Sequence, residues 1–187
     1  YRRQRQMCIR DSKKADIHEG LDSTLMILLP RLKETASQPA IEIIKQYGNL
    51  PQIDCYPGEL NQVFMNILNN AIDALRDDSN YSHLTDENNS TQMPTIRIIT
   101  DILNSENPDT AQRVLIRIKD NGIGMNKEII DNIFNPFFTT KPVGKGTGLG
   151  LYISYQIVVE KHGGELKCFS EPGKGTELTI EIPFHQR

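Results

Sequence analysis

The sequence predicts a single α+β domain, in which amphipathic helices and alternating strands share one hydrophobic core. Apolar residues recur at three- and four-residue steps in two stretches, 16–38 and 59–76, which is the spacing of helices. By contrast, 95–102 and 113–120 alternate apolar and polar residues, as half-buried strands do. A length of 187 residues allows one domain with a substantial core, plus a helix or a tail.

The composition excludes several classes of protein. A net charge of -3, with no basic stripe beyond the first fourteen residues, argues against nucleic-acid binding. No apolar run approaches the length of a membrane span and the start has no apolar signal-peptide core, so we expect no membrane contact by this chain. Cys8, Cys55 and Cys168 are odd in number and lack metal-ligand spacing. They favour a reducing, cytoplasmic location, whether or not other segments attach the full-length protein to a membrane.

The first part of the chain divides into a tail and a helix. Residues 1–12 are basic and aperiodic, and they look more like translated adapter sequence than a folded element. We therefore set residues 1–14 apart as a tail of non-native character. From Asp16 the apolar periodicity predicts an amphipathic helix that ends before Pro39.

Strands are predicted in three pairs, at 40–47 with 52–55, at 95–102 with 113–120, and at 165–169 with 176–182. The first pair is expected to form a hairpin, because Gly48-Asn49 and Pro51 separate its two strands. The second is expected to be antiparallel. The polar, acidic stretch 77–94 is predicted to be a surface insertion.

The helix at 59–76 carries a polar stripe of unusual composition, formed by Gln62, Asn66, Asn70 and Asp73. Most polar stripes are simply solvated faces. Solvated faces, however, favour Lys and Glu, which are absent together with Arg from 61–75, and each Asn costs about half a kcal/mol of helix propensity relative to Ala. A carboxamide oxygen suits a hard cation such as Mg²⁺. We therefore interpret the stripe as facing a ligand.

Asp120 ends a predicted strand on its apolar side. Val114, Ile116 and Ile118 share one face by the two-residue period, and Asp120 belongs to the same face. One interpretation is an Asp that turns into the following loop, since Asn121-Gly122 is a strong turn dipeptide. The other is an acceptor at the rim of a pocket, where Gly122 and Gly124 leave room for a flat ring.

The stretch 134–153 reads FNPFFTTKPVGKGTGLGLYI, a loop rich in Phe and Gly that turns into an apolar helix. Free amides at a helix start suit anions, and glycine lets a phosphate approach closely. The spacing matches neither a P-loop nor a dinucleotide fingerprint, and a plain flexible connection is the alternative. Phe137 and Phe138 are expected to anchor this loop, which we call the lid, in the core. A short helix is predicted before it, at 127–133, and the helix after it ends at 162–164.

Four stretches then resemble, in order, the motifs of one family. NQVFMNILNNAIDAL is similar to the asparagine box, DNGIGM to the first glycine box, FNPFFTTKPVGKGTGLGL to the phenylalanine and second glycine boxes, and GKGTELTIEIP to the last glycine box. Together they resemble the ATP-binding catalytic domain of bacterial sensor histidine kinases, in the superfamily of gyrase, gyrase-like chaperones and mismatch-repair ATPases. The resemblance covers 16–184. It implies a two-layer α/β sandwich over 15–187, with a mixed, mostly antiparallel sheet packed on three helices.

The resemblance also implies ATP and Mg²⁺ as ligands and assigns roles to individual residues. Asn70 would bind Mg²⁺ and Asn66 would help to position the metal and the phosphates, with Lys141 as a third catalytic residue. Asp120 would accept the adenine amino hydrogen. The other nucleotide contacts would come from Asp73, Gly122, Gly124, Phe137, Lys145, Gly146, Thr147, Gly148, Leu149, Gly150 and Thr176.

The acceptor histidine of this family lies on a separate dimerisation hairpin. His18-Glu19 lacks the following Pro or basic residue and is interpreted as the start of a helix. His83, His162 and His185 are expected to be structural or solvated. The chain would therefore donate phosphate to a histidine domain in trans, in a two-component phosphorelay with a response regulator downstream. Two alternatives are a gyrase-like ATPase, in which a Glu stands where this chain has Asn66, and a non-catalytic nucleotide-sensing module.

Overall fold

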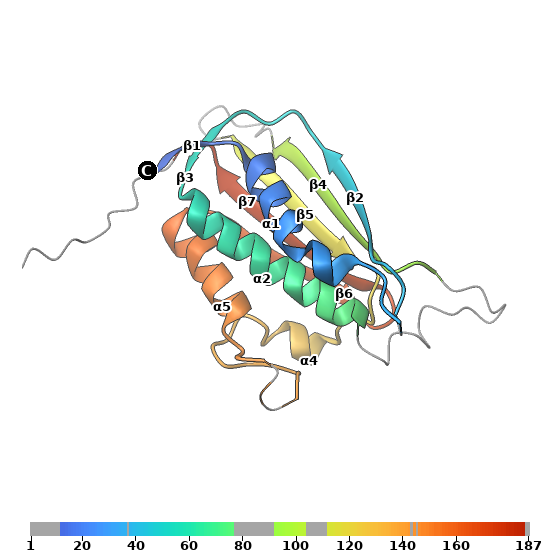
Figure 1. Cartoon of the computed structure of the whole chain (residues 1–187). Helices are drawn as coiled ribbons and strands as arrows, with labels where there is room; N and C mark the ends of the chain where they lie inside the picture. Colours follow the sequence, from blue (N-terminus) through green and yellow to red (C-terminus); the bar gives the residue numbers. More distant parts are fainter. Residues whose placement is uncertain are drawn as a thin grey trace, which may run out of the picture.

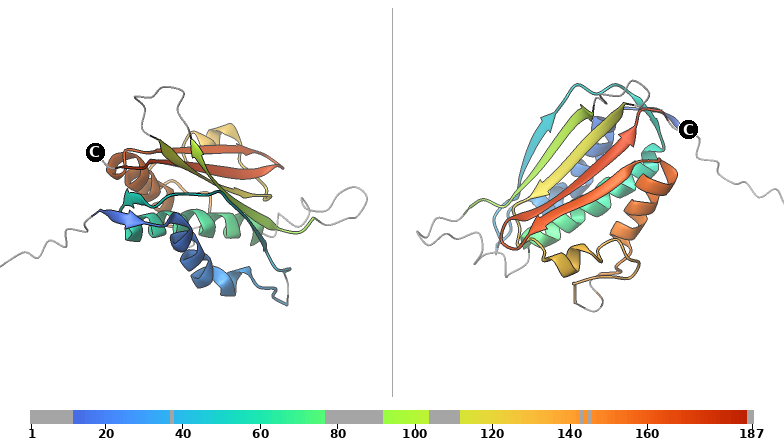
Figure 2. Two further views of the ribbon diagram at one scale, coloured as in Figure 1. Left: turned by 90° about the horizontal axis from the view of Figure 1, so that it is seen from above. Right: turned by 180° about the vertical axis from the view of Figure 1, so that it is seen from behind.

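The computed structural model describes residues 12–36, 38–76, 92–103, 112–142, 144 and 146–185. These residues form two layers, a five-stranded sheet and a set of helices against one of its faces (Figure 1). Seen from above, the helices Ile17–Leu32 and Pro57–Arg76 lie on one side of the strands, and from behind, the other face of the sheet carries no helix in the described part of the chain (Figure 2). The predicted α+β sandwich, with a mixed sheet packed on helices, is confirmed.

The large sheet has the strand order β2-β4-β5-β7-β6. Only β2 and β4 are parallel, and the other neighbours are antiparallel, including the predicted pairs β4 with β5 and β6 with β7. Two short strands, β1 and β3, pair with each other outside this sheet. The strands are β1 (Lys13–Ala15), β2 (Glu42–Tyr47), β3 (Ile53–Cys55), β4 (Thr95–Leu103), β5 (Arg113–Asp120), β6 (Glu165–Glu171) and β7 (Gly175–Pro183).

The predicted hairpin between 40–47 and 52–55 is wrong. β2 lies beside β4, and β3 lies beside β1. The reason is visible at Gly48, whose N–H donates to Thr100 O at 2.9 Å, so the chain leaving β2 stays bound to β4 instead of turning back. A side chain at Gly48 would come within 2.6 Å of that same oxygen. Glycine is therefore needed here because two backbones approach closely, and not because the chain makes a tight turn.

The helices are α1 (Ile17–Leu32), α2 (Pro57–Arg76), α4 (Lys127–Ile130) and α5 (Gly150–Tyr155), the last continuing as the π-helix η1 (Gln156–Lys161). α1 starts where predicted, because the Asp16 carboxylate accepts the His18 N–H at 2.8 Å. α4 is shorter than the predicted 127–133 and continues as turns. α2 lies between α1 on one side and the α4–α5 segment on the other (Figure 1).

The core forms where α2 packs on the inner face of the sheet. Every large apolar side chain buried in this way stabilises the fold by about 1.5–3 kcal/mol relative to its exposed state. Because so many residues on one side of α2 are buried, the helix has a single allowed rotation about its axis. The buried residues of α2 are Leu60, Val63, Phe64, Ile67, Leu68, Ala71, Ile72 and Leu75.

His162 joins the end of η1 to the start of α2. Its side chain is buried, with Nδ1 at 2.7 Å from Ile157 O and Nε2 accepting the Tyr56 N–H at 3.1 Å. Since a carbonyl can only accept and an amide N–H can only donate, the ring must be neutral and protonated on Nδ1. The expectation of a structural histidine is confirmed at this position.

We expect the contribution of His162 to the free energy of unfolding to fall as the pH is lowered from 7.5 to 6. Burial lowers the pKa of His162, against the raising effect of its bond to Ile157 O. At His162 the folded state therefore binds fewer protons than the unfolded state near pH 6.5, and the stability that this side chain contributes above that pH is lost below it. Urea denaturation across this range measures the slope. The variant His162→Asn should lose this contribution to the slope, and about 1–3 kcal/mol of stability at pH 7.5. An equal slope in wild type and variant would contradict the assignment, and His185→Asn, at an exposed histidine, is the control.

Candidate functional site

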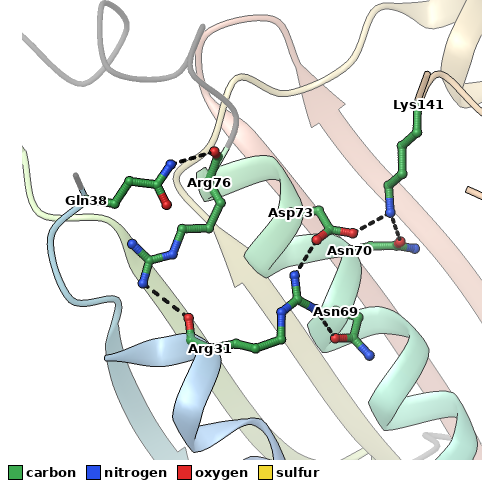
Figure 3. A network of polar contacts seen from close by, with 7 residues as sticks. All are labelled: Arg31, Gln38, Asn69, Asn70, Asp73, Arg76 and Lys141. Atoms are coloured by element: carbon green, nitrogen blue, oxygen red, sulfur yellow. Dashed lines mark hydrogen bonds and ion pairs between the residues drawn. The ribbon is translucent and has the colours of Figure 1, made fainter. Parts of the chain in front are cut away.

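The polar stripe of α2 faces the segment that contains α4, the lid and α5. Asn66, Asn70 and Asp73 are half-buried there, and the close-up in Figure 3 shows Asn70 and Asp73 beside Lys141 of the lid. Gln62, the first residue of the predicted stripe, is exposed. The interpretation of this side as a plain solvated face therefore does not hold for its last three members.

Asn66 ties α2 to the start of α5. Its Nδ2 donates to Gly150 O at 3.0 Å and lies 3.3 Å from Ser154 Oγ, and the buried Ser154 hydroxyl donates to the same Gly150 oxygen at 2.9 Å. A carbonyl oxygen can only accept, so the side-chain nitrogen of Asn66 must point at α5. The carboxamide oxygen then points away from these contacts and is the atom left to meet a ligand.

Asn70 and Asp73 present two oxygens to the Lys141 ammonium. Lys141 Nζ lies 3.3 Å from Asn70 Oδ1 and is in direct contact with Asp73 Oδ2 (Figure 3). Burial alone would raise the pKa of Asp73, but hydrogen bonds from Lys141 and Arg31 outweigh it and hold the pKa below its ordinary value. Asp73 is therefore ionised at neutral pH, and this pair of oxygens favours a cation.

The fit of this site to Mg²⁺ follows from its ligand set. No group of three or more His, Cys, Asp or Glu side chains gathers to hold a metal within the described ranges. Mg²⁺ commonly takes only one or two protein oxygens and completes its shell with water and substrate phosphates. An amide oxygen with a neighbouring carboxylate fits that mode of binding, whereas it would not suffice for a metal held by protein alone.

Asp120 lies at the end of β5 and is 5% exposed. Its Oδ1 accepts the N–H groups of Gly122, at 2.9 Å, and of Thr176, at 3.3 Å. Burial raises the pKa of Asp120 to about 6, although these two N–H groups act in the opposite direction. The position on the apolar face, alongside Val114, Ile116 and Ile118, is as predicted. The Gly122 N–H that Asp120 accepts belongs to the turn after the strand. Asp120 can therefore both begin this turn and serve as an acceptor at the rim of a pocket.

Close packing of the backbone explains why glycines follow Asp120. A side chain at Gly122 would meet Asp120 Oδ1 at 2.9 Å and Ala74 Cβ at 3.3 Å, which places this loop directly against α2. Gly124 has φ +69, and a side chain there would lie 2.0 Å from Glu171 O. Contact with a flat ring stays a prediction for both residues, since close backbone packing already requires glycine.

The lid folds back on itself at its glycines. Gly148 has φ +65, and a side chain there would approach the carbonyl carbon of Phe137 to 2.3 Å. At Gly146 it would come within 2.7 Å of Thr139 Oγ1. The two arms of the loop thus lie against each other, and no side chain caps the start of α5 at Leu149. Amides at this helix start are therefore available to an anion.

Phe137 differs from the prediction. It was expected to anchor the lid in the core, but it is 74% exposed and has φ +66, a left-handed conformation that is rare for an aromatic residue. Phe138 is half-buried, and the nearby Phe134 packs against the core. The tight contact with Gly148 explains the outcome, since the chain must reverse at Phe137. Lys145, the other predicted lysine, lies outside the described residues.

The Asp120 loop, the lid and the start of α5 all contact one stretch of α2. The Asp120 loop packs against Ala74, Lys141 contacts Asn70 and Asp73, and Gly150 is held by Asn66. Thr176, predicted near the base, donates its N–H to Asp120. A hollow of about 250 Å³ elsewhere, lined by Lys13, Asp16, Asn61 and others, lies at the starts of α1 and α2 and contains none of the predicted residues.

The described histidines all have structural partners. His18 stacks on Tyr47 with 4.3 Å between ring centroids, and its Nε2 lies 2.8 Å from Thr100 Oγ1. This geometry agrees with a histidine at a helix start and not with a free acceptor. His185 Nδ1 pairs with Asp54 Oδ2 at 2.8 Å, His162 is buried as described above, and His83 lies outside the described residues.

A comparison with protein families decides the class. Residues 56–186 match the family of histidine kinase-, DNA gyrase B- and HSP90-like ATPases. The chain belongs to this ATPase family. Among solved structures, the catalytic domain of histidine kinase ThkA superposes with a TM-score of 0.70 at 23% identity, covering 94% of this chain and 97% of that one. Full-length ShkA in complex with AMPPNP gives 0.69 at 24%, covering 94% and 32%.

Curated relatives of this ATPase-family chain are sensor kinases. Sporulation kinase E of Bacillus subtilis is 39% identical over 138 residues, which are 74% of this chain and 15% of the relative. Sensor histidine kinase ZraS of Escherichia coli is 34% identical over 136 residues, 73% of this chain and 24% of the relative. The chain thus spans a quarter or less of the length of these relatives. Within the described residues, every helix is too short or too polar to cross a membrane.

We expect Asp120→Asn to become more stable relative to wild type as the pH rises. The pKa of Asp120 is raised from 3.8 to about 6, so the folded state holds a proton that the unfolded state releases between these values. Wild type therefore loses stability as pH rises through this window, and the neutral amide does not. The difference in unfolding free energy should grow by about 2–3 kcal/mol from pH 4 to pH 7.5. Urea titrations of both proteins test this, and a constant difference would refute the raised pKa.

Gly148→Ala is expected to destabilise the domain, whereas Gly150→Ala is not. The first substitution puts a side chain 2.3 Å from Phe137 at a positive φ, which costs about 1–3 kcal/mol. At Gly150 the nearest atom would be 3.6 Å away and the backbone is helical, so Ala should be neutral or stabilise by up to about 1 kcal/mol. Thermal unfolding of both variants measures this. Equal effects would show that the lid is not held in the described fold.

Proposed function

We propose that this domain binds Mg-ATP and donates the γ-phosphate to a histidine on a separate dimerisation hairpin of the same protein. The phosphate would then pass to a response regulator, as in a two-component phosphorelay. The observation that carries the proposal is the convergence of Asp120, the amide stripe of α2 and the glycine-rich lid on one stretch of helix. Membership of the ATPase family and the sensor kinases among the relatives support it.

The base end of the site would be built around Asp120. With Oδ1 occupied by two backbone N–H groups, the carboxylate has Oδ2 left to accept the exocyclic amino group of adenine. A buried acceptor of this kind discriminates strongly, because a base without the amino group would leave it unpaired. Thr176 and the backbone near Gly122 and Gly124 would complete this end of the site.

The phosphate end would be built from α2 and the lid. Asn70 Oδ1, with Asp73 beside it, would hold Mg²⁺, which when bound neutralises charge on the phosphates. The Lys141 side chain would move, so that its ammonium leaves these oxygens and contacts the phosphates. Amides at the start of α5 and the glycines of the lid would meet the remaining oxygens. Phosphoryl transfer depends mostly on positioning and charge stabilisation, so these groups suffice on the donor side.

Asn66 favours transfer to a protein acceptor over hydrolysis. A hydrolase of this superfamily needs a general base to activate water, and a carboxamide cannot accept a proton at neutral pH. The Nδ2 of Asn66 is moreover engaged by Gly150 O. The acceptor would be a histidine on the separate hairpin, since the histidines of the described residues have structural partners. A cytoplasmic location, which the odd number of cysteines favours, would suit this transfer, and Cys55 and Cys168 are both free thiols.

Asp120→Asn and Asn70→Ala should each weaken binding of a non-hydrolysable ATP analogue at least tenfold, the first through the adenine contact and the second through the metal. Calorimetric titrations with and without Mg²⁺ measure this, and the Mg²⁺ dependence should disappear only in Asn70→Ala. Matched controls are Asp101→Asn, at an exposed position of β4, and Asn61→Ala, on α2 but away from the stripe.

The transfer step is tested with a purified dimerisation hairpin from a related sensor kinase. We expect ATP-dependent phosphorylation of its histidine in trans, and little release of free phosphate without it. Analogue binding unchanged in both variants would refute the site. Steady ATP turnover by the chain alone would favour the gyrase-like hydrolase, and tight binding without any transfer would favour a nucleotide-sensing module.

A further inference from the structure

Arg31 reaches the phosphate end of the site from outside every motif. It lies in the last turn of α1, and its guanidinium crosses to α2, where it pairs with Asp73 Oδ1 at 2.5 Å and contacts Asn69 Oδ1 (Figure 3). Asp73 Oδ2 is in contact with Lys141 of the lid. One carboxylate is therefore shared, one oxygen each, between a cation of α1 and a cation of the lid.

The end of α1, which carries Arg31, is held against α2 by side-chain hydrogen bonds. Arg76 donates to three backbone carbonyls at the end of α1 and just beyond it, those of Arg31 at 3.1 Å, Lys33 at 2.8 Å and Pro39 at 2.7 Å. Gln38 in turn donates to Arg76 O at 2.9 Å. These bonds satisfy carbonyls that a helix end leaves without partners. The backbone of Arg31 is thereby fixed against α2, as Figure 3 shows.

The shared carboxylate makes the two cations competitors. Arg31 and Lys141 repel each other, and each reduces the attraction that Asp73 offers to the other. Their side chains are 44% and 34% exposed, and Asp73 is 34% exposed, so every term in this balance is small and screened by salt. A contact built from such small terms can be released.

We propose that Arg31 is a positioning residue for the lid lysine, which balances the charge of Asp73 before and after the lysine moves. While Lys141 is on Asp73, Arg31 keeps that pair weak. When Lys141 moves to the phosphates, Arg31 remains as a cation on Asp73, so that even without Mg²⁺ no bare carboxylate faces the polyanion. The second half rests on the proposed function, whereas the first concerns the chain alone and is tested without nucleotide.

The nucleotide arm of the test is a double-mutant cycle with Arg31→Met and Asp73→Asn. Arg31→Met should weaken binding of ADP without Mg²⁺ about two- to fivefold, the size expected for exposed ion pairs. The loss should shrink in 0.5 M salt and vanish in the Asp73→Asn background, since no charge is then left to balance. Arg31→Lys should retain most of the affinity. Lys33→Met is the matched control, because it removes an exposed cation near the same helix end whose ammonium makes no ion pair among the described residues.

The second arm measures amide hydrogen exchange of the 187-residue chain without nucleotide. The reporter is the Lys141 amide, which donates to Thr139 Oγ1 at 3.1 Å. Arg31→Met should slow its exchange about two- to fivefold, because Lys141 then has Asp73 to itself. If Arg31 only held α1 on α2, exchange would become faster in the lid and in both helices, and the thermal midpoint would fall.

Faster or unchanged exchange at Lys141 in Arg31→Met would overturn the proposal. So would an affinity loss that persists in the Asp73→Asn background. Should no variant or wild type bind ADP at all, the proposed function would fail while the exchange arm still decides the role of Arg31 on its own.

Discussion

The burial of one side of α2 against the sheet is the constraint on which the rest of the structure depends. Leu60, Ile67, Leu68 and Ile72 have no freedom to turn toward solvent, because each would lose about 1.5–3 kcal/mol of burial. A helix with one side fixed has its opposite side fixed as well. The amide stripe is therefore aimed by apolar packing that takes no part in the chemistry, and the lid meets it in a defined register.

The site concentrates features that reduce stability. Asp120 is an ionisable group in an apolar setting, with its pKa raised to about 6. Phe137 has a backbone conformation that aromatic residues rarely adopt. Neither helps the domain to fold. Both are held by neighbours whose packing is favourable, Asp120 by the amides of Gly122 and Thr176, and Phe137 by contact with Gly148. Such local costs, compensated elsewhere, are expected where function sets the geometry.

Most of the fold followed from periodicity, and residue chemistry singled out the segments that the structure brings together, while the ligand roles of their residues stay predictions. The two long helices, the antiparallel pairs and the buried position of Asp120 were predictable, because local patterns determine them. The partner of β2 was not, since a short strand followed by Gly48 carries no record of whether it pairs with its neighbour or with β4. The exposure of Phe137 and the π-helix at the end of α5 depend on contacts between distant segments. Arg31 lacked any signal, because one charge at a helix end looks like solvated surface.

The ribbon formed by β1 and β3 brings both ends of the described chain together. β1 pairs with β3, and Asp54 N–H donates to Phe184 O at 3.0 Å, so the end of β7 lies close to the first strand (Figure 1). From there α2 runs to Asn70 over thirteen residues, a rise of about 20 Å. Under the proposed function, a domain attached at these two ends would lie far from the phosphate end of the site. With that function, phosphoryl transfer to such a domain would require this domain to rotate about its attachment, and the stiffness of the connecting segment would then limit the rate.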